Sequence, residues 1–240
     1  MPFAAVNGLN MYYEIHGDGL PLLLLHGGGG PVSAKWISIF SPHFRVIAPQ
    51  QMGYGRTADV VDRPFHYHDM AEDSVELMRH LGVESAVVFG YSDGGIIGLD
   101  MAIHRPERVT RLAVTGANAH TDGYAAEHWE GVAANPNNLP VPEAYVRLSP
   151  DGAEHWPVLF GRLQRMWAVE PCFSREQLQS IKAPTLLVFG DDDLVTVEHA
   201  VTMFRTISGA QLCVVPHAGH GVMPEEAVLT FLQEASPGEQ

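Results

Sequence analysis

Ser92 has a setting that could make it a nucleophile, because the segment Gly90–Gly94 reads GYSDG and fits the pattern G-x-S-x-G. The apolar run Ala86–Phe89 leads directly into this segment, and residues from Ile96 to Ile103 continue it with helical spacing. A serine between a strand and a helix lies on a sharp, strained turn, where side chains in place of the two glycines would collide. The positive end of the helix would also favour developing negative charge. We therefore predict that Ser92 attacks a carbonyl group; the alternative is a glycine-rich helix start with an idle serine.

A second glycine-rich segment could bind an oxyanion. His26 and the four glycines at positions 27–30 follow the apolar run Pro21–Leu25. A tetrahedral intermediate carries a negatively charged oxygen that needs fixed N–H donors, and glycines let backbone amides approach it. The amide of Asp93, directly after the nucleophile, is the expected second donor. A phosphate-binding loop is the weaker alternative, since there is no G-x-x-x-x-G-K-[ST] motif. We expect His26 to brace the loop.

A serine hydroxyl needs a base, and the base needs a carboxylate that orients it. Among the 13 histidines, His220 is the candidate because it lies just after the last predicted strand, with His217 as its close rival. The acid is expected in Gly190–Asp193, directly after the apolar run Thr185–Phe189. Three adjacent acids cannot all belong to one triad, so one or two of them should be solvated or structural.

The pair His66 and His68 could suggest a metal site. No third ligand is spaced along the sequence to join the pair, and there is no H-E-x-x-H motif. We therefore predict neither a metal nor an organic cofactor.

Short apolar runs alternate with helical patterns, which predicts a mostly parallel sheet covered by helices on both faces. The first segment reads as an antiparallel hairpin, with Phe3–Val6 and Leu9–Ile15 flanking Asn7-Gly8, a dipeptide suited to positive φ angles. The further predicted strands are Pro21–Leu25, Phe44–Ala48, Ala86–Phe89, Leu112–Val114, Thr185–Phe189 and Leu212–Val215.

The interval from residue 119 to 178 shows no clear strand and holds three of the four tryptophans. We predict a small helical cap there, with the core formed by residues 1–118 and 179–240. Some of its large apolar side chains should line an apolar pocket above Ser92. Trp129, Trp156 and Trp167 are the candidates for binding substrate.

The composition excludes several classes of protein. The chain has 240 residues, enough for one sizeable core, and a formal net charge of −14 that speaks against nucleic acid or an anionic membrane as partner. The two cysteines, Cys172 and Cys213, read as buried thiols of a reducing compartment. With no signal peptide and no membrane-length apolar stretch, we expect a cytoplasmic protein. Its expected partner is a small-molecule substrate, and its oligomeric state cannot be read from the sequence.

The order of serine, acid and histidine, each at the C-terminal end of a predicted strand, resembles the α/β-hydrolase superfamily. The resemblance covers nearly the whole chain and implies a doubly wound sheet with an antiparallel N-terminal hairpin and a small helical cap. Besides the hairpin and the serine turn, it rests on His26-Gly27, Gly53–Thr57 (GYGRT), Gly190–Asp193 and Ala218–His220 (AGH).

The resemblance also selects residues. Members usually place the acid three residues after the glycine, which implies Asp193, and the base in a Gly-His pair, which implies His220. The first residue after His-Gly usually gives an oxyanion amide, which implies Gly28. The sequence departs from the family at Gln50, where members often have aspartate. It departs again at Asp93, where an apolar residue often follows the nucleophile.

The function expected from these residues is hydrolysis of a small or medium, partly hydrophobic carboxylic ester through an acyl-enzyme. A serine at the turn argues against the haloalkane dehalogenase and epoxide hydrolase relatives, which resemble this chain but use aspartate. The same triad also resembles lactonases, amidases, perhydrolases and hydrolases of carbon–carbon bonds. A different class of protein, a small-molecule receptor on the hydrolase scaffold, is the remaining alternative.

Overall fold

The structure is a computed structural model that describes residues 2–28, 30–125 and 135–234. Its centre is an eight-stranded sheet with the order β1-β2-β4-β3-β5-β6-β7-β8. The strands are β1 (Phe3–Val6), β2 (Leu9–His16), β3 (Pro21–Leu25), β4 (Arg45–Pro49), β5 (Ala86–Tyr91), β6 (Val109–Thr115), β7 (Thr185–Asp192) and β8 (Gln211–Gly219).

The sheet is mixed. Strand β2 pairs antiparallel with β1 and with β4, and every later pairing is parallel. The turn between β1 and β2 contains Asn7 with φ of +45° and Gly8 with φ of +85°, the positive values predicted for this dipeptide. The predicted fold class, a mostly parallel sheet with an antiparallel N-terminal pair, is therefore confirmed.

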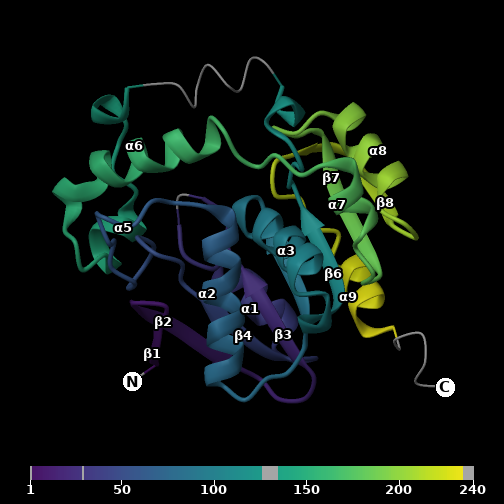
Figure 1. Cartoon of the computed structure of the whole chain (residues 1–240), viewed down its shortest axis with the longest axis horizontal. Coiled ribbons are helices and arrows are strands. Elements are labelled where there is room, and N and C mark those ends of the chain that lie inside the picture. The colour runs from purple at the N-terminus through teal and green to yellow at the C-terminus, as the bar shows by residue number, and fades with distance from the viewer. Residues whose placement is uncertain (1, 29, 126–134, 235–240) are drawn as a thin grey trace.

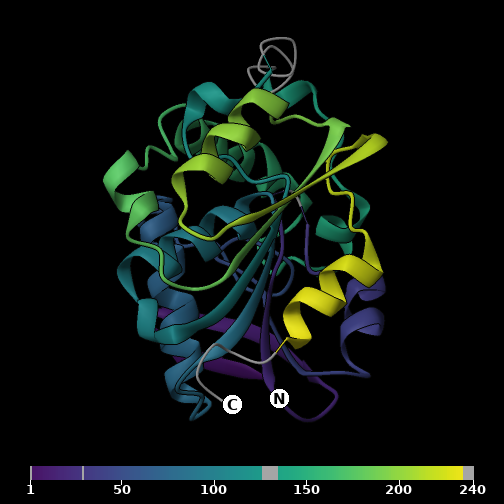
Figure 2. The same ribbon diagram turned by 90° about the vertical axis from the view of Figure 1, so that its right-hand side faces the viewer.

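Helices cover both faces of the twisted sheet (Figures 1 and 2). The alternation along β3 shows why: Leu22 and Leu24 pack with residues of α1 and α9, whereas Leu23 and Leu25 pack with residues of α2, α3 and α8. The α-helices are α1 (Ala34–Phe40), α2 (Tyr67–His80), α3 (Asp93–His104), α5 (Glu143–Leu148), α6 (Trp156–Trp167), α7 (Arg175–Gln179), α8 (Val197–Thr206) and α9 (Glu225–Gln233). Short 3₁₀ helices are η1 (Pro106–Arg108), η2 (Thr121–Gly123), η3 (Pro136–Asn138) and η4 (Ala153–His155).

The segment between β6 and β7 contains no strand of the main sheet among its described residues. It contributes η2, η3, α5, η4, α6 and α7, and Figure 1 shows α6 above the upper end of α2, with α5 to the left. Helix α6 carries an apolar side that includes Leu159, Leu163 and Met166, all buried in the same cluster as α2 and α3. The segment between β6 and β7, called the cap segment below, thus packs on the core through a buried apolar side.

The expectation of two buried cysteines is wrong. Cys172 is exposed and Cys213 is partly exposed, and neither is in a disulfide. Cys172 lies in the connection between α6 and α7, and Cys213 lies on β8, the last strand of the sheet. A connecting segment and an edge strand have fewer neighbours to cover a side chain, which explains the difference.

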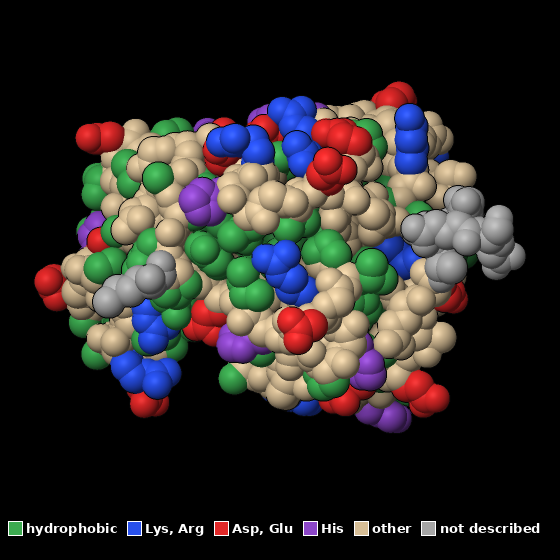
Figure 3. Space-filling model, turned by 90° about the horizontal axis from the view of Figure 1, so that it is seen from below, with side chains coloured by type: hydrophobic (Ala, Val, Ile, Leu, Met, Phe, Trp, Pro, Cys, Tyr) green, Lys and Arg blue, Asp and Glu red, His purple; other side chains and the backbone are tan. Residues whose placement is uncertain are grey.

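The surface seen in Figure 3 carries Lys and Arg side chains scattered among Asp and Glu. This distribution, with the net charge of −14, gives that face no basic patch suited to nucleic acid. Within the described ranges, no helix is long and apolar enough to span a lipid bilayer.

Candidate active site

Ser92 lies at the turn between β5 and α3 in a strained backbone conformation, with φ of +52° and ψ of −120°. Its amide donates to the carbonyl of Thr115 over 2.9 Å, which ties the turn to the neighbouring strand. A Cβ at Gly90 would lie 2.3 Å from the carbonyl oxygen of Gly94, and one at Gly94 would lie 2.3 Å from that of Leu25. The two glycines therefore permit the turn that exposes the serine hydroxyl.

Ser92, His220 and Asp193 come together at the carboxyl ends of three different strands. Ser92 Oγ lies 3.0 Å from His220 Nε2, and His220 Nδ1 lies 2.6 Å from Asp193 Oδ1. Because the buried carboxylate can only accept, Nδ1–H must donate to it, which leaves Nε2 free to accept the serine proton. Asp193 also accepts from the amides of Val195 and Gly190, at 3.2 and 3.4 Å, so its side chain is held in place.

The alternative candidates for the acid and the base do not join this hydrogen-bonded group. Asp191 and Asp192 are exposed, and Asp191 Oδ1 accepts from the amide of Ala218 at 3.1 Å. Backbone N–H groups of His217 and Ala218 lower the pKa of Asp191. His217 is exposed, with φ of +56°. Asp191 thus links β7 to β8, and the structure brings only Asp193 to His220.

Gly28 and Asp93, the two residues predicted to bind an oxyanion, line one cavity with Ser92. A Cβ at Gly28 would lie 2.8 Å both from Asp93 Oδ2 and from the Trp167 ring, so only glycine fits there. Helix α3 begins at Asp93, and the first amides of a helix have no acceptor within it. The amides of Gly95 and Ile96 donate to the carbonyl of Ser92, and the amide of Asp93 remains the donor predicted for an oxyanion. Gly29, in the same glycine run, lies outside the described residues.

His26 braces the glycine-rich loop that follows β3, as predicted from the sequence. Its Nδ1–H donates to the carbonyl of Gly27 at 2.9 Å, and its Nε2 accepts from the amide of Gln51 at 3.0 Å. The ring of Tyr54 packs edge-on against it, with centroids 4.9 Å apart. Burial lowers the pKa of His26 to about 4, so the ring is neutral near pH 7 and its two bonds match the neutral tautomer.

The buried neutral ring of His26 should make the protein sensitive to acid. An unfolded histidine has a pKa of about 6.5, above that of the folded one, so the unfolded state binds more protons between pH 6.5 and about 4. Stability is therefore full above about pH 6.5 and falls as the pH drops through this window. The loss from His26 should reach on the order of 3 kcal/mol at its lower end.

Urea unfolding between pH 7.5 and 4.5 measures this loss. His26→Gln should reduce the slope of unfolding free energy against pH, although the variant is less stable at pH 7.5. His43 is exposed, and His43→Gln should keep the wild-type slope. Equal slopes for wild type and His26→Gln would contradict the prediction.

Gln50 closes the neighbouring loop at the position where the family often has aspartate. Its side-chain oxygen accepts from the amide of Arg56 at 2.6 Å, and its backbone carbonyl accepts from the hydroxyl of Thr57 at 2.7 Å. A neutral amide thus braces this loop without a buried negative charge.

Asp93 carries a buried carboxylate beside the nucleophile and is only 4% exposed. Its Oδ1 accepts from the hydroxyl of Tyr67 at 2.8 Å, and the indole N–H of Trp167 lies 3.1 Å from each carboxylate oxygen. Burial raises its pKa. In the described part of the chain, no Lys or Arg forms a salt bridge with it. Tyr67 was not anticipated here, because nothing in its sequence context points to residue 93.

A cavity of about 170 Å³ opens beside Ser92. Its lining residues are Gly28, Tyr91, Ser92, Asp93, Tyr124, Trp167, Leu194 and His220. A hollow of about 310 Å³ shares Gly28, Tyr91 and His220 with it and extends to Trp36 and Pro31. The cavity beside Ser92 is small, and the aromatic rings of Tyr91, Tyr124 and Trp167 form part of its wall.

The three tryptophans predicted to bind substrate have separate locations. Trp167 lines the cavity beside Ser92. Trp156 does not: it is buried in the cap segment between Tyr145 and Phe160, with ring centroids 5.1 and 5.4 Å away. Trp129 lies outside the described residues. The sequence pattern could not show which of the three tryptophans lines the cavity, because all three lie in the same interval without a predicted strand.

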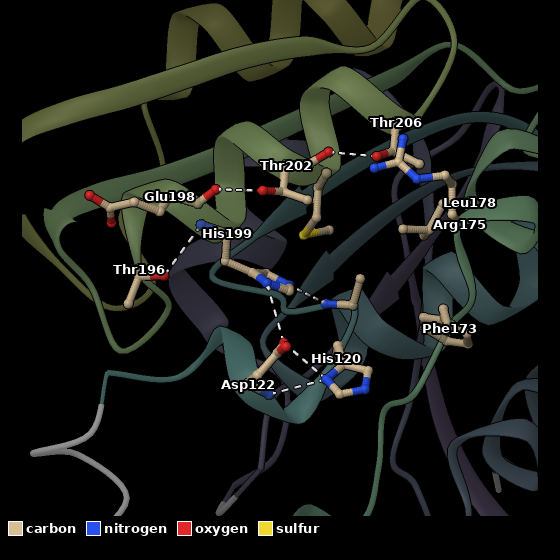
Figure 4. A pocket seen from close by; sticks show the side chains of 12 residues that line it. His120, Asp122, Phe173, Arg175, Leu178, Thr196, Glu198, His199, Thr202 and Thr206 are labelled. Carbon is tan, nitrogen blue, oxygen red and sulfur yellow. Dashed lines mark hydrogen bonds and ion pairs between the residues drawn. The ribbon is translucent and has the colours of Figure 1, made fainter.

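A second hollow, of about 350 Å³, lies between the start of the cap segment and α8 (Figure 4). His199 points into it, and its Nε2 accepts from the amide of Ala119 at 3.0 Å. Asp122 lies between the rings of His199 and His120, and His120 Nδ1 is 2.9 Å from Asp122 Oδ1. Its described lining residues include no nucleophile paired with a base, and these contacts fasten the segment after β6 to α8.

Comparison with known proteins agrees with this geometry. Residues 21–135 match the family described as alpha/beta hydrolase fold. RutD of Azorhizobium caulinodans, whose name describes a carbamate hydrolase, is 31% identical, and the match covers 98% of this chain and 99% of RutD. The chain belongs to the α/β-hydrolase family.

Two further family members are similar over most of their length. The serine hydrolase BPHL of Mus musculus is 28% identical, and the match covers 91% of this chain and 79% of that protein. A mutant form of the meta-cleavage product hydrolase CumD of Pseudomonas fluorescens IP01 superposes with a TM-score of 0.74 at 25% identity, over 95% of this chain and 93% of CumD. This α/β-hydrolase is thus similar to enzymes with different named substrates.

Proposed function

We propose that this protein is a serine hydrolase that cleaves a small or medium, partly hydrophobic carboxylic ester. The observation that carries the proposal is the chain of hydrogen bonds from Ser92 Oγ to His220 Nε2 and from His220 Nδ1 to Asp193 Oδ1, at 3.0 and 2.6 Å. A serine, a base and an orienting carboxylate at these distances form the arrangement that acyl transfer needs.

The reaction follows from the positions of these groups. Ser92 Oγ attacks the ester carbonyl carbon while His220 Nε2 takes the serine proton, and Asp193 stabilises the imidazolium that forms. The amides of Gly28 and Asp93 donate to the oxyanion. His220 then gives the proton to the leaving alcohol oxygen, and the acyl group remains on Ser92. A water molecule, activated by the same base, releases the acid and restores the serine.

The cavity limits the substrate. A space of about 170 Å³ beside Ser92 fits a short acyl part, and the adjoining hollow of about 310 Å³ fits an alcohol part. The aromatic lining favours apolar groups, whose burial contributes roughly 25 cal/mol per Å² before the costs of binding.

Asp93 adds a charge preference. Its buried carboxylate lines the cavity among the rings of Tyr91, Tyr124 and Trp167, and no Lys or Arg of the described ranges forms a salt bridge with it. An anionic substrate would meet this carboxylate and the net charge of −14. A substrate ammonium group would instead find a carboxylate and aromatic faces, which both attract cations.

We therefore expect kcat/KM to fall in the order ammonium-bearing, neutral and carboxylate-bearing within a matched series of small esters. Asp93→Asn should lower kcat/KM for the ammonium ester by about 10- to 100-fold, the range for a lost hydrogen bond to a charged group. Neutral esters should change only a few-fold. A preference of the wild type for the carboxylate-bearing ester would contradict this assignment of the cavity.

Other bonds are the alternatives within the same chemistry. RutD is named for carbamate hydrolysis and CumD for cleavage of a meta-cleavage product, and lactones and peracids react through similar triads. A panel that adds lactones, carbamates and vinylogous diketones to the esters ranks these reactions directly. A small-molecule receptor would bind members of the panel with turnover slower than about one event per minute.

A further inference from the structure

Two histidines meet one buried carboxylate where the start of α2 lies beside α3. His68 Nδ1 is 3.0 Å from Asp100 Oδ1, and His104 Nδ1 is 3.2 Å both from the same oxygen and from the backbone carbonyl oxygen of Asp100. One ligand atom of each residue lies within 4.8 Å of the other two. Asp100 and His104 are four residues apart on α3 and so share one face of that helix. His66, the other histidine of the pair considered from the sequence, is not part of this group, and the two further members come from α3 through the packing of the helices.

The carboxylate of Asp100 needs a positive partner. Asp100 is 3% exposed, and in the described part of the chain its salt-bridge partners are His68 and His104, with no Lys or Arg among them. When both rings are neutral, the negative charge stays buried and uncompensated, which is costly. A divalent cation held by the three side chains would neutralise it.

We propose that His68, Asp100 and His104 form a binding site for a divalent transition-metal ion, with Zn²⁺ as the best match. Imidazole nitrogens and a carboxylate oxygen bind Zn²⁺ at about 2.0–2.2 Å, so tetrahedral ligand atoms lie about 3.3 Å apart. The two nitrogen–oxygen distances, 3.0 and 3.2 Å, are close to this value. The three ligand atoms lie within 4.8 Å of one another, so the two rings must move closer together to admit the ion and must lose the Nδ1 protons that they would otherwise donate.

The site is open to solvent on one side. The side chains of His68 and His104 are 51% and 34% exposed, and all three residues line a hollow of about 460 Å³. An ion can therefore enter without opening the core, and water can occupy the fourth position. Two nitrogens and one oxygen favour Zn²⁺ and its neighbours among the transition metals over Mg²⁺ or Ca²⁺.

The bound ion would stabilise the packing of α2 against α3 and would take no part in the reaction at Ser92. Asp100 lies eight residues after Ser92 on the helix, about 12 Å along its axis, so the ion is too far away to contact the reacting atoms. It would join α2 to α3, and His68 directly follows Tyr67, whose hydroxyl donates to Asp93. A metal that binds only the folded state raises stability by mass action, and here it would also fix the start of α2.

The cluster of His120, Asp122 and His199 provides a contrast. Asp122 is 75% exposed and His199 Nδ1 lies 3.9 Å from it, while His199 Nε2 already accepts from the amide of Ala119. The carboxylate there is exposed to solvent, and the His199 nitrogen nearest to it is farther away than the nitrogens that face Asp100. This second cluster is therefore a matched control.

Titration of the metal-stripped protein with Zn²⁺ by calorimetry, and with Co²⁺ by visible absorption, tests the proposal. We expect one tightly bound ion per chain, tetrahedral Co²⁺ bands and a rise in Tm with Zn²⁺. His68→Ala and His104→Ala should each weaken binding at least about tenfold, because loss of an outer-shell partner alone has that effect. Circular dichroism checks that each variant is folded, and the exposure of His68 favours a folded His68→Ala.

His120→Ala and His220→Ala should bind Zn²⁺ like the wild type. The proposal is overturned if the wild type binds no Zn²⁺ or if folded His68→Ala binds it with unchanged affinity. It is equally overturned if binding disappears in His120→Ala or His220→Ala, since the ion would then occupy the cap cluster or the triad.

Discussion

Ser92→Ala should lower kcat for ester hydrolysis by about 10⁴- to 10⁶-fold, the range seen when a catalytic triad loses a member. The hydroxyl oxygen forms the bond to the substrate carbon, and alanine has no group that could replace it. The residual rate would come from water, assisted by the amides of Gly28 and Asp93 and by the binding of the substrate.

The variant should fold normally. Among the described residues, the Ser92 side chain forms its hydrogen bond with His220, and alanine at φ of +52° meets the same backbone strain as serine. Unfolding curves in urea should therefore nearly coincide with the wild type. This separates loss of chemistry from loss of structure.

A fluorophosphonate probe gives an independent measurement of the same role. It should label the wild type at Ser92 alone and fail to label Ser92→Ala. Labelling at another serine, or hydrolysis in Ser92→Ala at the wild-type rate, would refute the role of Ser92 as nucleophile.

The sheet could be predicted from the sequence because its strands are short apolar runs with buried residues on both faces. Two such runs are Pro21–Leu25 and Thr185–Phe189, which lie in β3 and β7 of the structure. Strand ends were less predictable: β7 continues to Asp192 and β8 to Gly219, and these two residues pair with each other beyond a shift in register. Helix α1, of seven residues, was missed because two turns give too short a period to detect.

The geometry of the triad could be anticipated because it depends on local order along the chain. Each of its residues follows a strand, and the carboxyl ends of parallel strands meet at one edge of the sheet. The contacts of Asp93 with Tyr67 and of His68 with Asp100 and His104 could not be anticipated. They depend on how α2 packs against α3 and on where Trp167 of the cap segment lies, which no spacing in the sequence encodes.

Asp193→Asn should lower kcat by about 10⁴-fold, the effect of a histidine held in the wrong tautomer. In the wild type, Asp193 Oδ1 accepts from His220 Nδ1–H over 2.6 Å. Oδ1 also accepts from the amide of Val195, and Oδ2 accepts from the amide of Gly190, so the single oxygen of the variant cannot serve all three donors. In either orientation the variant lacks the negative charge that stabilises the imidazolium. Where the NH₂ group takes the Oδ1 position, it faces Nδ1 as a second donor. His220 then carries its proton on Nε2 and points it at Ser92 Oγ, where it can no longer accept.

Asp191→Asn is the matched control, two residues away on the same strand end. Its carboxylate is exposed and accepts from the amide of Ala218 at 3.1 Å, a bond that the oxygen of asparagine can keep. The rate of this variant should stay within a few-fold of the wild type, because the position of His220 is unchanged. If Asp191→Asn instead lost the activity and Asp193→Asn kept it, the acid would have to be reassigned, and His220 would have to reach Asp191 in the working enzyme.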